Sequence, residues 1–177
     1  MPDNDYELLL RCLRKEVDAE YMLYERYAAR MYGLCLRYGG NEAEAEDMLQ
    51  EGFMKLFSSL RDFRFEGNLD GWVKRIFVTT ALNYRRIQKT GPAVELTEEV
   101  ESETVREDIL SNISVKDLLA LIRRLPPGFR TIFNLYAIEE YNHKEIAEML
   151  GITEGTSKSQ YHRARKAIRQ MINETEK

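Results

Sequence analysis

A basic stretch near the carboxyl end carries side chains of the kind that bind nucleic acid. Between Thr156 and Asn173 the sequence contains no acidic residue. Its hydrogen-bond donors recur at helical spacing: Lys158, Ser159, Gln160, Arg163 and Lys166. Such groups can hydrogen bond to base edges and pair with phosphates in a DNA major groove. The alternative interpretation is a helical hairpin whose basic face is simply solvated.

The residues before this stretch predict a helix-turn-helix that would position it. Asn142 is a good N-cap for a short helix, and Gly151 supplies the positive φ that a tight turn needs. Thr153 can then cap a last helix over residues 154–173. Ala147 is small, as a close crossing of the two helices requires. This combination favours DNA reading over a generic hairpin.

A second group of candidate nucleic-acid ligands lies near the middle of the chain. From Gly71 to Val94 there is again no acidic residue. The helix expected from about residue 70 to 88 has a buried stripe at Val73, Ile76, Phe77, Thr80, Tyr84 and Ile87. Its polar, basic face carries Trp72, Arg75, Thr79, Asn83 and Arg86. The loop before it holds Phe63, Arg64 and Phe65, and single-stranded nucleic acid needs such rings to stack on and cations for its phosphates. Alternatively, Trp72 is an ordinary core anchor and the basic residues only aid solubility.

A third candidate is the polar face of an amphipathic helix expected from Asn41 to Leu60, with Asn41 as its N-cap. Opposite its apolar stripe this segment carries Asp47, Gln50, Glu51 and Met54. Charge on one face of a helix is usually just solvated. The face by itself therefore gives little reason to expect a protein partner.

The composition and periodicity predict an all-α fold of two small helical domains. The chain has 177 residues with 44% hydrophobic and 32% charged residues, and only four prolines and ten glycines. We place the domains at residues 1–90 and 114–177. The segment 91–113 between them is expected to be a flexible linker, because residues 95–108 hold seven acids and one arginine. The net charge of −4 hides this segregation of acids from bases.

Motifs for catalysis, metal binding or membrane insertion are missing from the sequence. It contains no P-loop, dinucleotide fingerprint or nucleophile elbow, so we expect no enzyme and no cofactor. Cys12 and Cys35 fit neither a disulfide framework nor a metal pair, and Cys35 is expected in the core. His143 and His162 have no ligand partners at suitable spacing and are expected at the surface or near DNA. We find no signal peptide and no membrane span, and expect a soluble, cytoplasmic protein.

Three blocks of the sequence resemble the extracytoplasmic-function (ECF) sigma factors, which bring RNA polymerase to promoters. Residues 44–57 (EAEDMLQEGFMKLF) resemble the family's polymerase-binding helix. Residues 63–86 resemble the segment that melts and reads the minus-ten element. Residues 125–168 resemble the helix-turn-helix that reads the minus-thirty-five element. The blocks occur in the family's order and together span most of residues 20–170.

This resemblance implies a role for each candidate group. Asp47, Gln50 and Glu51 would dock on the clamp helices of the polymerase largest subunit. The minus-ten DNA would meet Phe63, Arg64, Phe65, Asn68, Leu69, Trp72, Arg75, Thr79, Asn83 and Arg86. The minus-thirty-five DNA would meet Thr156, Lys158, Ser159, Gln160, His162, Arg163 and Lys166. The implied partners are core RNA polymerase, promoter DNA and an anti-sigma factor, with no direct membrane insertion.

Three positions depart from the family's commonest pattern. Thr79 stands where asparagine is usual, Ser157 replaces an aliphatic residue and Gln160 replaces an arginine. We expect Ser157 to weaken one core contact, and Gln160 to prefer adenine over guanine.

Two other functions compete with a sigma factor. A plain helix-turn-helix regulator would leave the Asp47 face and the helix that carries Trp72 without a role. A helical adaptor would leave both basic stretches unexplained.

Overall fold

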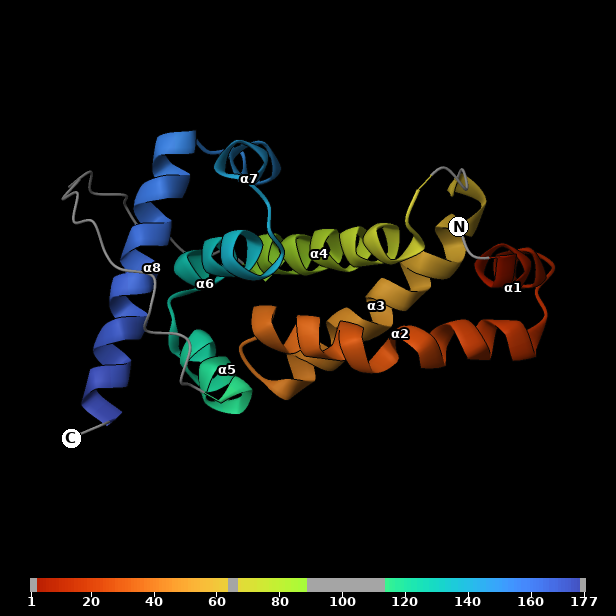
Figure 1. The fold of residues 1–177 in the computed structure, drawn as a ribbon, viewed down its shortest axis with the longest axis horizontal. Helices are drawn as coiled ribbons and strands as arrows, with labels where there is room; N and C mark the ends of the chain where they lie inside the picture. The colour runs from red at the N-terminus through yellow and green to blue at the C-terminus, as the bar shows by residue number, and fades with distance from the viewer. Residues whose placement is uncertain (1–2, 64–66, 89–113, 176–177) are drawn as a thin grey trace. The chain divides into compact units, whose positions relative to one another are not determined.

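Helices make up all the regular structure in the parts of the chain described here. A computed structural model describes residues 3–63, 67–88 and 114–175, and these ranges contain no strand, which confirms the all-α fold (Figure 1). The chain divides into two compact units, residues 1–91 and 92–177. Arg64, Phe65 and the expected linker 91–113 lie outside the described residues.

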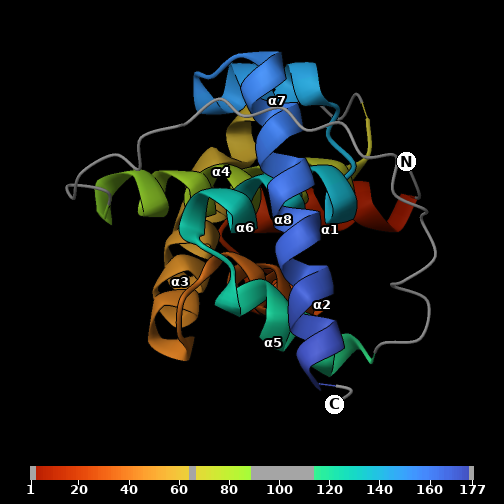
Figure 2. The same ribbon diagram turned by 90° about the vertical axis from the view of Figure 1, so that its left-hand side faces the viewer.

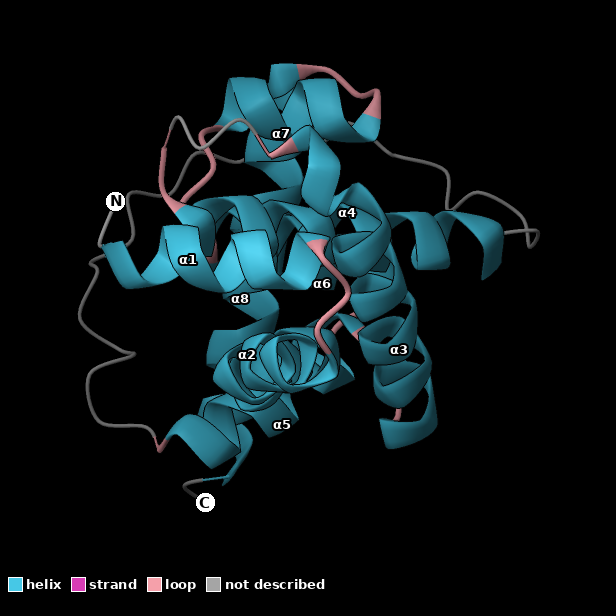
Figure 3. Ribbon diagram, turned by 90° about the vertical axis from the view of Figure 1, so that its right-hand side faces the viewer, coloured by secondary structure: helices cyan, strands magenta, loops and turns pink. Residues whose placement is uncertain are grey.

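The first unit is built on three long helices that all pack against one another. Helix α3 packs against both α2 and α4, while α1 packs on α2 (Figure 3). The elements of this unit are α1 (Asp3–Leu13), α2 (Val17–Tyr38), α3 (Glu42–Ser59), the 3₁₀ turn η1 (Leu60–Asp62) and α4 (Leu69–Gln88).

Local capping chemistry sets where α3 and α4 begin. The Asn41 side chain accepts a hydrogen bond from the backbone N–H of Glu44, which confirms the cap predicted there. The Asn68 side chain likewise accepts from the backbone N–H of Asp70, so α4 begins at Leu69, within one residue of its expected start.

A close approach of α3 and α4 forms the centre of the first core. The Phe77 ring lies over Gly52, where an added Cβ would be only 2.3 Å from Phe77 Cε1. Phe77 also meets Phe53 edge-on, with ring centroids 5.1 Å apart. Glycine on α3 therefore lets an aromatic residue of α4 fill the space between the helices.

The thiol of Cys35 on α2 lies in the same core. Cys35 is fully buried, as predicted, and burial raises the pKa of its thiol to about 12.

The buried surface of α4 is wider than its apolar stripe predicts. Thr80 is buried as expected, whereas Ile76 remains partly exposed. Val78 and Ala81, which lie outside the expected stripe, are fully buried. The reason is that α4 packs against α2 as well as α3, so more of its circumference is covered.

The second unit packs three shorter helices against one long one. Helix α8 contacts α5, α6 and α7 along its length (Figure 2). The elements are α5 (Val115–Arg124), α6 (Pro127–Phe133), a π-helical turn η3 (Asn134–Ile138), α7 (His143–Leu150) and α8 (Glu154–Thr175). One cluster of buried core residues consists of Leu121, Ile122, Leu125, Phe133, Ala164 and Ile168.

The helix-turn-helix forms as predicted. Asn142 and Glu145 make a reciprocal capping box at the start of α7, with each side chain bonded to the other's backbone N–H. Gly151 adopts a left-handed conformation at φ 67°, and Thr153 Oγ1 accepts from the backbone N–H of Thr156. One segment before it differs from the sequence pattern: the apolar spacing of Phe129, Ile132, Phe133 and Tyr136 predicts one helix starting at Pro127, but this helix changes after Phe133 into the π-helical turn.

Candidate nucleic-acid and protein interfaces

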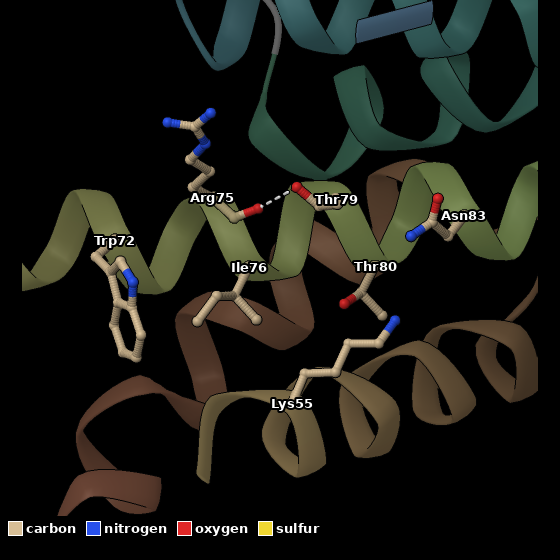
Figure 4. A pocket seen from close by; sticks show the side chains of 7 residues that line it. All are labelled: Lys55, Trp72, Arg75, Ile76, Thr79, Thr80 and Asn83. Carbon is tan, nitrogen blue, oxygen red and sulfur yellow. Dashed lines mark hydrogen bonds between the residues drawn. The ribbon is translucent and has the colours of Figure 1, made fainter. Parts of the chain in front are cut away.

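A cavity of about 310 Å³ opens along one face of α4 in the first unit (Figure 4). Its lining residues are Lys55, Trp72, Arg75, Ile76, Thr79, Thr80 and Asn83. Four of them, Trp72, Arg75, Thr79 and Asn83, are expected minus-ten residues that the helical spacing placed on one face. The volume is at the small end of sites that hold organic ligands, roughly 300–1,000 Å³.

The cavity has an apolar wall and polar groups around it. Trp72 and Ile76 form the wall, and Arg75 and Asn83 are exposed side chains on the same helix. The Thr80 side chain is 1% exposed, and its hydroxyl has no hydrogen-bond partner among the described residues. An apolar wall beside an unsatisfied hydroxyl suits a flat, partly polar ligand such as a nucleobase.

Sequence reasoning missed three of the lining residues. Lys55 belongs to α3, and spacing along α4 cannot show which neighbouring helix closes the cavity. Ile76 and Thr80 fall in the buried stripe that the apolar spacing predicts, although their positions four and eight residues after Trp72 are the signal that could have found them. Thr79 Oγ1 donates to the backbone carbonyl of Arg75 at 2.8 Å, so this hydroxyl is already engaged.

Two expected minus-ten residues, Phe63 and Leu69, are buried at the ends of the loop before α4. Their exposed fractions are 7% and 2%, and the Phe63 ring lies 4.9 Å from that of Trp72. Asn68 between them is exposed. In this structure the buried Phe63 ring packs against Trp72, and the base stacking expected of Phe63 stays a prediction.

A hydrogen bond from α2 fixes the start of α4. The hydroxyl of buried Tyr27 donates to Asp70 Oδ1 at 2.7 Å, and Arg30 lies 3.5 Å from the other carboxylate oxygen. The bond from Tyr27, and then the charge of Arg30, lowers the pKa of Asp70. Burial and the same bond raise the pKa of Tyr27. These contacts hold the helix that carries Trp72.

The expected polymerase-binding residues lie on the outer face of α3. Asp47 and Gln50 are exposed and Glu51 is partly exposed. Asp47 accepts a hydrogen bond from the Tyr84 hydroxyl at 3.1 Å, and Glu51 pairs with Lys55 at 2.5 Å. The hydrogen bond from Tyr84 of α4 thus orients the Asp47 carboxylate, which remains exposed to solvent.

The expected minus-thirty-five residues occupy the outward side of α8. Lys158 and Lys166 are exposed, whereas the others are partly exposed: Thr156, Ser159, Gln160, His162 and Arg163. Lys158 pairs with Glu154 at 2.7 Å, and Ser159 Oγ donates to the backbone carbonyl of Thr156. Lys158 therefore has an acidic neighbour on the same helix.

His143 and Ser157 differ from expectation. His143 is not a plain surface residue, because its ring stacks on Tyr136 with centroids 4.2 Å apart and planes 13° apart. Ser157 is fully buried, and its Oγ lies 2.9 Å from His143 Nδ1. The serine thus replaces an aliphatic contact with a hydrogen bond rather than only weakening the core.

Comparison with known proteins places both units in one family. The model of Sigma-70 region 2 matches residues 23–90, and that of Sigma-70 region 4 matches residues 116–168. The ECF RNA polymerase sigma factor SigW of Bacillus subtilis is 32% identical over 171 residues, which cover 89% of this chain and 90% of the relative. The chain belongs to the ECF sigma factor family.

A second relative supports the same assignment. The ECF RNA polymerase sigma-E factor of Haemophilus influenzae is 30% identical over 180 residues, which cover 95% of each chain. This sigma factor is accordingly a promoter-specific transcription initiation factor, and the family's role is DNA binding rather than catalysis.

Solved structures show the same fold at lower identity. CnrH, solved with the cytosolic domain of CnrY, has a TM-score of 0.54 and 19% identity, covering 97% of this chain and 98% of its own. RpoE from Bartonella quintana, solved with the anti-sigma factor NepR, has a TM-score of 0.55 and 18% identity, covering 86% and 96%. None of the sigma factor's described helices is long and apolar enough to cross a membrane.

Proposed function

We propose that the two units of this sigma factor divide promoter recognition between them. The first, residues 1–90, binds core RNA polymerase through Asp47, Gln50 and Glu51 on α3, and reads and melts the minus-ten element along α4. The second, residues 114–177, reads the minus-thirty-five element with α8.

The observation that carries this proposal is the cavity on α4. Unstacking a base costs a few kcal/mol, which a protein recovers by giving the base a pocket with stacking and polar contacts. Trp72 and Ile76 offer such a wall, and Arg75 lies beside it for a phosphate. A regulator that binds only duplex DNA has no use for this cavity.

The proposed partners are core RNA polymerase, promoter DNA and an anti-sigma factor. The sigma factor would act in the cytoplasm, where polymerase and chromosome are, without catalytic activity or a cofactor of its own. The structural neighbours CnrH and RpoE were solved with CnrY and the anti-sigma factor NepR, and an anti-sigma factor is the third partner that we propose.

The direct test is transcription by purified core polymerase with this protein on a promoter library, with start sites mapped. We expect starts at a shared minus-ten and minus-thirty-five pair that are absent with core polymerase alone. Duplex binding without any effect on polymerase would instead support the simple regulator.

Charge reversal on α3 tests the polymerase contact. Asp47→Arg and Glu51→Arg should each weaken core binding at least tenfold, about 1.4 kcal/mol, because a basic partner would then be repelled. Both side chains point away from the core, so the fold should persist. Glu7→Arg, the same charge reversal at an exposed residue of α1, is the matched control. If Asp47→Arg and Glu51→Arg both bind core polymerase with unchanged affinity, this surface is not the polymerase contact.

A further inference from the structure

Three elements of the second unit meet around the imidazole of His143. The ring stacks on Tyr136 of η3, and Tyr161 of α8 lies against both, with centroids 4.5 Å from Tyr136 and 5.8 Å from His143. Nδ1 of the same ring is 2.9 Å from Ser157 Oγ on α8. His143 is the first residue of α7, so one side chain links α7, α8 and the π-helical turn.

The hydrogen bond constrains α8 more than an apolar contact would. Ser157 is fully buried, and a buried hydroxyl without a partner is destabilising, so α8 is held where Ser157 reaches Nδ1. An apolar contact tolerates sliding and rotation, whereas a hydrogen bond weakens steeply with distance and angle. Lys158 and Gln160 lie one and three residues after Ser157 on the helix. Any rotation of α8 therefore changes the direction in which their side chains point.

The π-helical turn brings the stacking partner into place. Such a turn shifts the side chains after it relative to an uninterrupted α-helix. Tyr136 lies within this turn, between α6 and α7. Its nearly parallel stack on His143 therefore depends on the unusual backbone, which ties the orientation of the imidazole to the α6 side of the unit.

The charges around this junction favour the neutral imidazole. Lys158 and Glu154 of α8 face it, and Lys144 follows it on α7. Burial first, and then the charge of Lys158, lowers the pKa of His143, with Glu154 opposing in part. Protonation would place a second cation beside Lys158 at the point where the two helices are joined.

We propose that His143 and Ser157 are positioning residues for promoter reading, whose hydrogen bond fixes the rotation of α8 and so the aim of its DNA-facing side chains. This inference rests on the proposed function of α8. Neither residue needs to touch DNA, because both act through the helix that does.

A pair of substitutions at position 143 separates the hydrogen bond from the ring. Both His143→Asn and His143→Gln remove the stack on Tyr136, but asparagine places a polar atom near the Nδ1 position and glutamine near the Nε2 position. Ser157→Ala removes the hydroxyl from the other side. Each full-length variant is assembled with core polymerase and titrated onto the duplex promoter found by start-site mapping, well below the unfolding temperature of every variant.

We expect Ser157→Ala and His143→Gln to weaken duplex binding about five-fold, and His143→Asn to stay within about two-fold of the parent protein. The loss should vanish on a template whose minus-thirty-five element is replaced, because α8 then contributes no specific contacts. Binding by the parent protein should hold from about pH 7.5 down to the ordinary histidine pKa of about 6.5, and should weaken relative to His143→Asn only at lower pH, because the pKa of His143 is lowered.

The outcomes distinguish this inference from the function on which it rests. If the parent holoenzyme shows no dependence on the minus-thirty-five element, the proposed role of α8 is wrong. If it does, and folded Ser157→Ala and His143→Gln bind as tightly as the parent, the positioning role is wrong. Equal losses in His143→Asn and His143→Gln would also overturn it, since the ring alone would then matter.

Discussion

In the first unit, α3 and α4 meet through apolar surfaces, with the Phe77 ring over Gly52 and edge-on to Phe53. In the second unit, α7 and α8 meet at a histidine–serine hydrogen bond, and the buried Arg130 of α6 caps carbonyls at the end of α5. The contact between α3 and α4 is thus close apolar packing. The contact between α7 and α8 instead has a polar pair inside it.

This difference teaches where each unit is vulnerable. Apolar packing resists changes of volume but is indifferent to charge at the surface, so the faces of α3 and α4 can be altered without moving the helices. Buried polar contacts have strict geometry, so their loss moves helices as well as destabilising them. Three substitutions probe this contrast, in order of decreasing effect.

Gly52→Ala should have the largest effect and should act on the first unit. The added Cβ would lie 2.3 Å from the Phe77 ring, and relieving that overlap should cost about 3 kcal/mol of unfolding free energy. Trp72 is the chain's only tryptophan, so its fluorescence during denaturation reports this unit. Gly33→Ala is the control, because nothing lies within 4 Å of a Cβ there. Equal stability of the two variants would disprove the close approach of α3 and α4.

Arg130→Met should act on the second unit with an intermediate effect. The guanidinium donates to the backbone carbonyls of Arg123 and Leu125, and losing those bonds should cost about 2 kcal/mol. Circular dichroism should show the loss, while the Trp72 fluorescence transition stays in place. Arg124→Met makes the same change at an exposed arginine and should be nearly neutral. A shift in the Trp72 transition would show that the units do not unfold separately.

Tyr27→Phe should have the smallest effect, about 1 kcal/mol, by removing the hydrogen bond to Asp70. The folded-state pKa of Asp70 is lowered, so its contribution is present above the unfolded value of about 3.9 and is lost as pH falls through the folded pKa. The variant should therefore lose less stability than the parent below about pH 4. Urea unfolding at several pH values measures this, with exposed Tyr21→Phe as control. If the free energy of unfolding falls equally at low pH in the parent, Tyr27→Phe and Tyr21→Phe, the hydrogen bond between Tyr27 and Asp70 does not contribute to stability.

The acid response should differ between the units. The pKa of His143 is also lowered, but for a histidine this favours the neutral form in the folded state. Its contribution is complete above the unfolded pKa of about 6.5 and falls as pH drops below that value. Acid should thus weaken the His143 junction at a higher pH than the Tyr27–Asp70 contact.

Local chemistry made much of the fold predictable. The caps at Asn41, Asn142 and Thr153 were predicted from the sequence, because a capping side chain reaches only its own helix. The left-handed Gly151 was predictable for the same reason. Spacing along α4 also placed Trp72, Arg75, Thr79 and Asn83 on one face.

Contacts between helices were not predictable in this way. The part that Lys55 plays in the α4 cavity, and the burial of Phe63 against Trp72, depend on how closely separate elements approach. The hydrogen bond between His143 and Ser157 joins residues 14 positions apart through a turn. Periodicity along one helix carries no information about the identity of the residue facing it.

The division of promoter recognition between the two units is tested most directly by measuring DNA melting and duplex binding on the same holoenzymes. Permanganate reactivity of promoter thymines reports melting, and filter binding reports capture of the duplex. Asn83→Ala, at the α4 cavity, should reduce melting more than capture, whereas Arg163→Ala, on α8, should weaken capture by about 1–3 kcal/mol and leave melting of bound DNA unchanged. If both variants lower melting and capture in the same proportion, the two units do not divide the work as proposed.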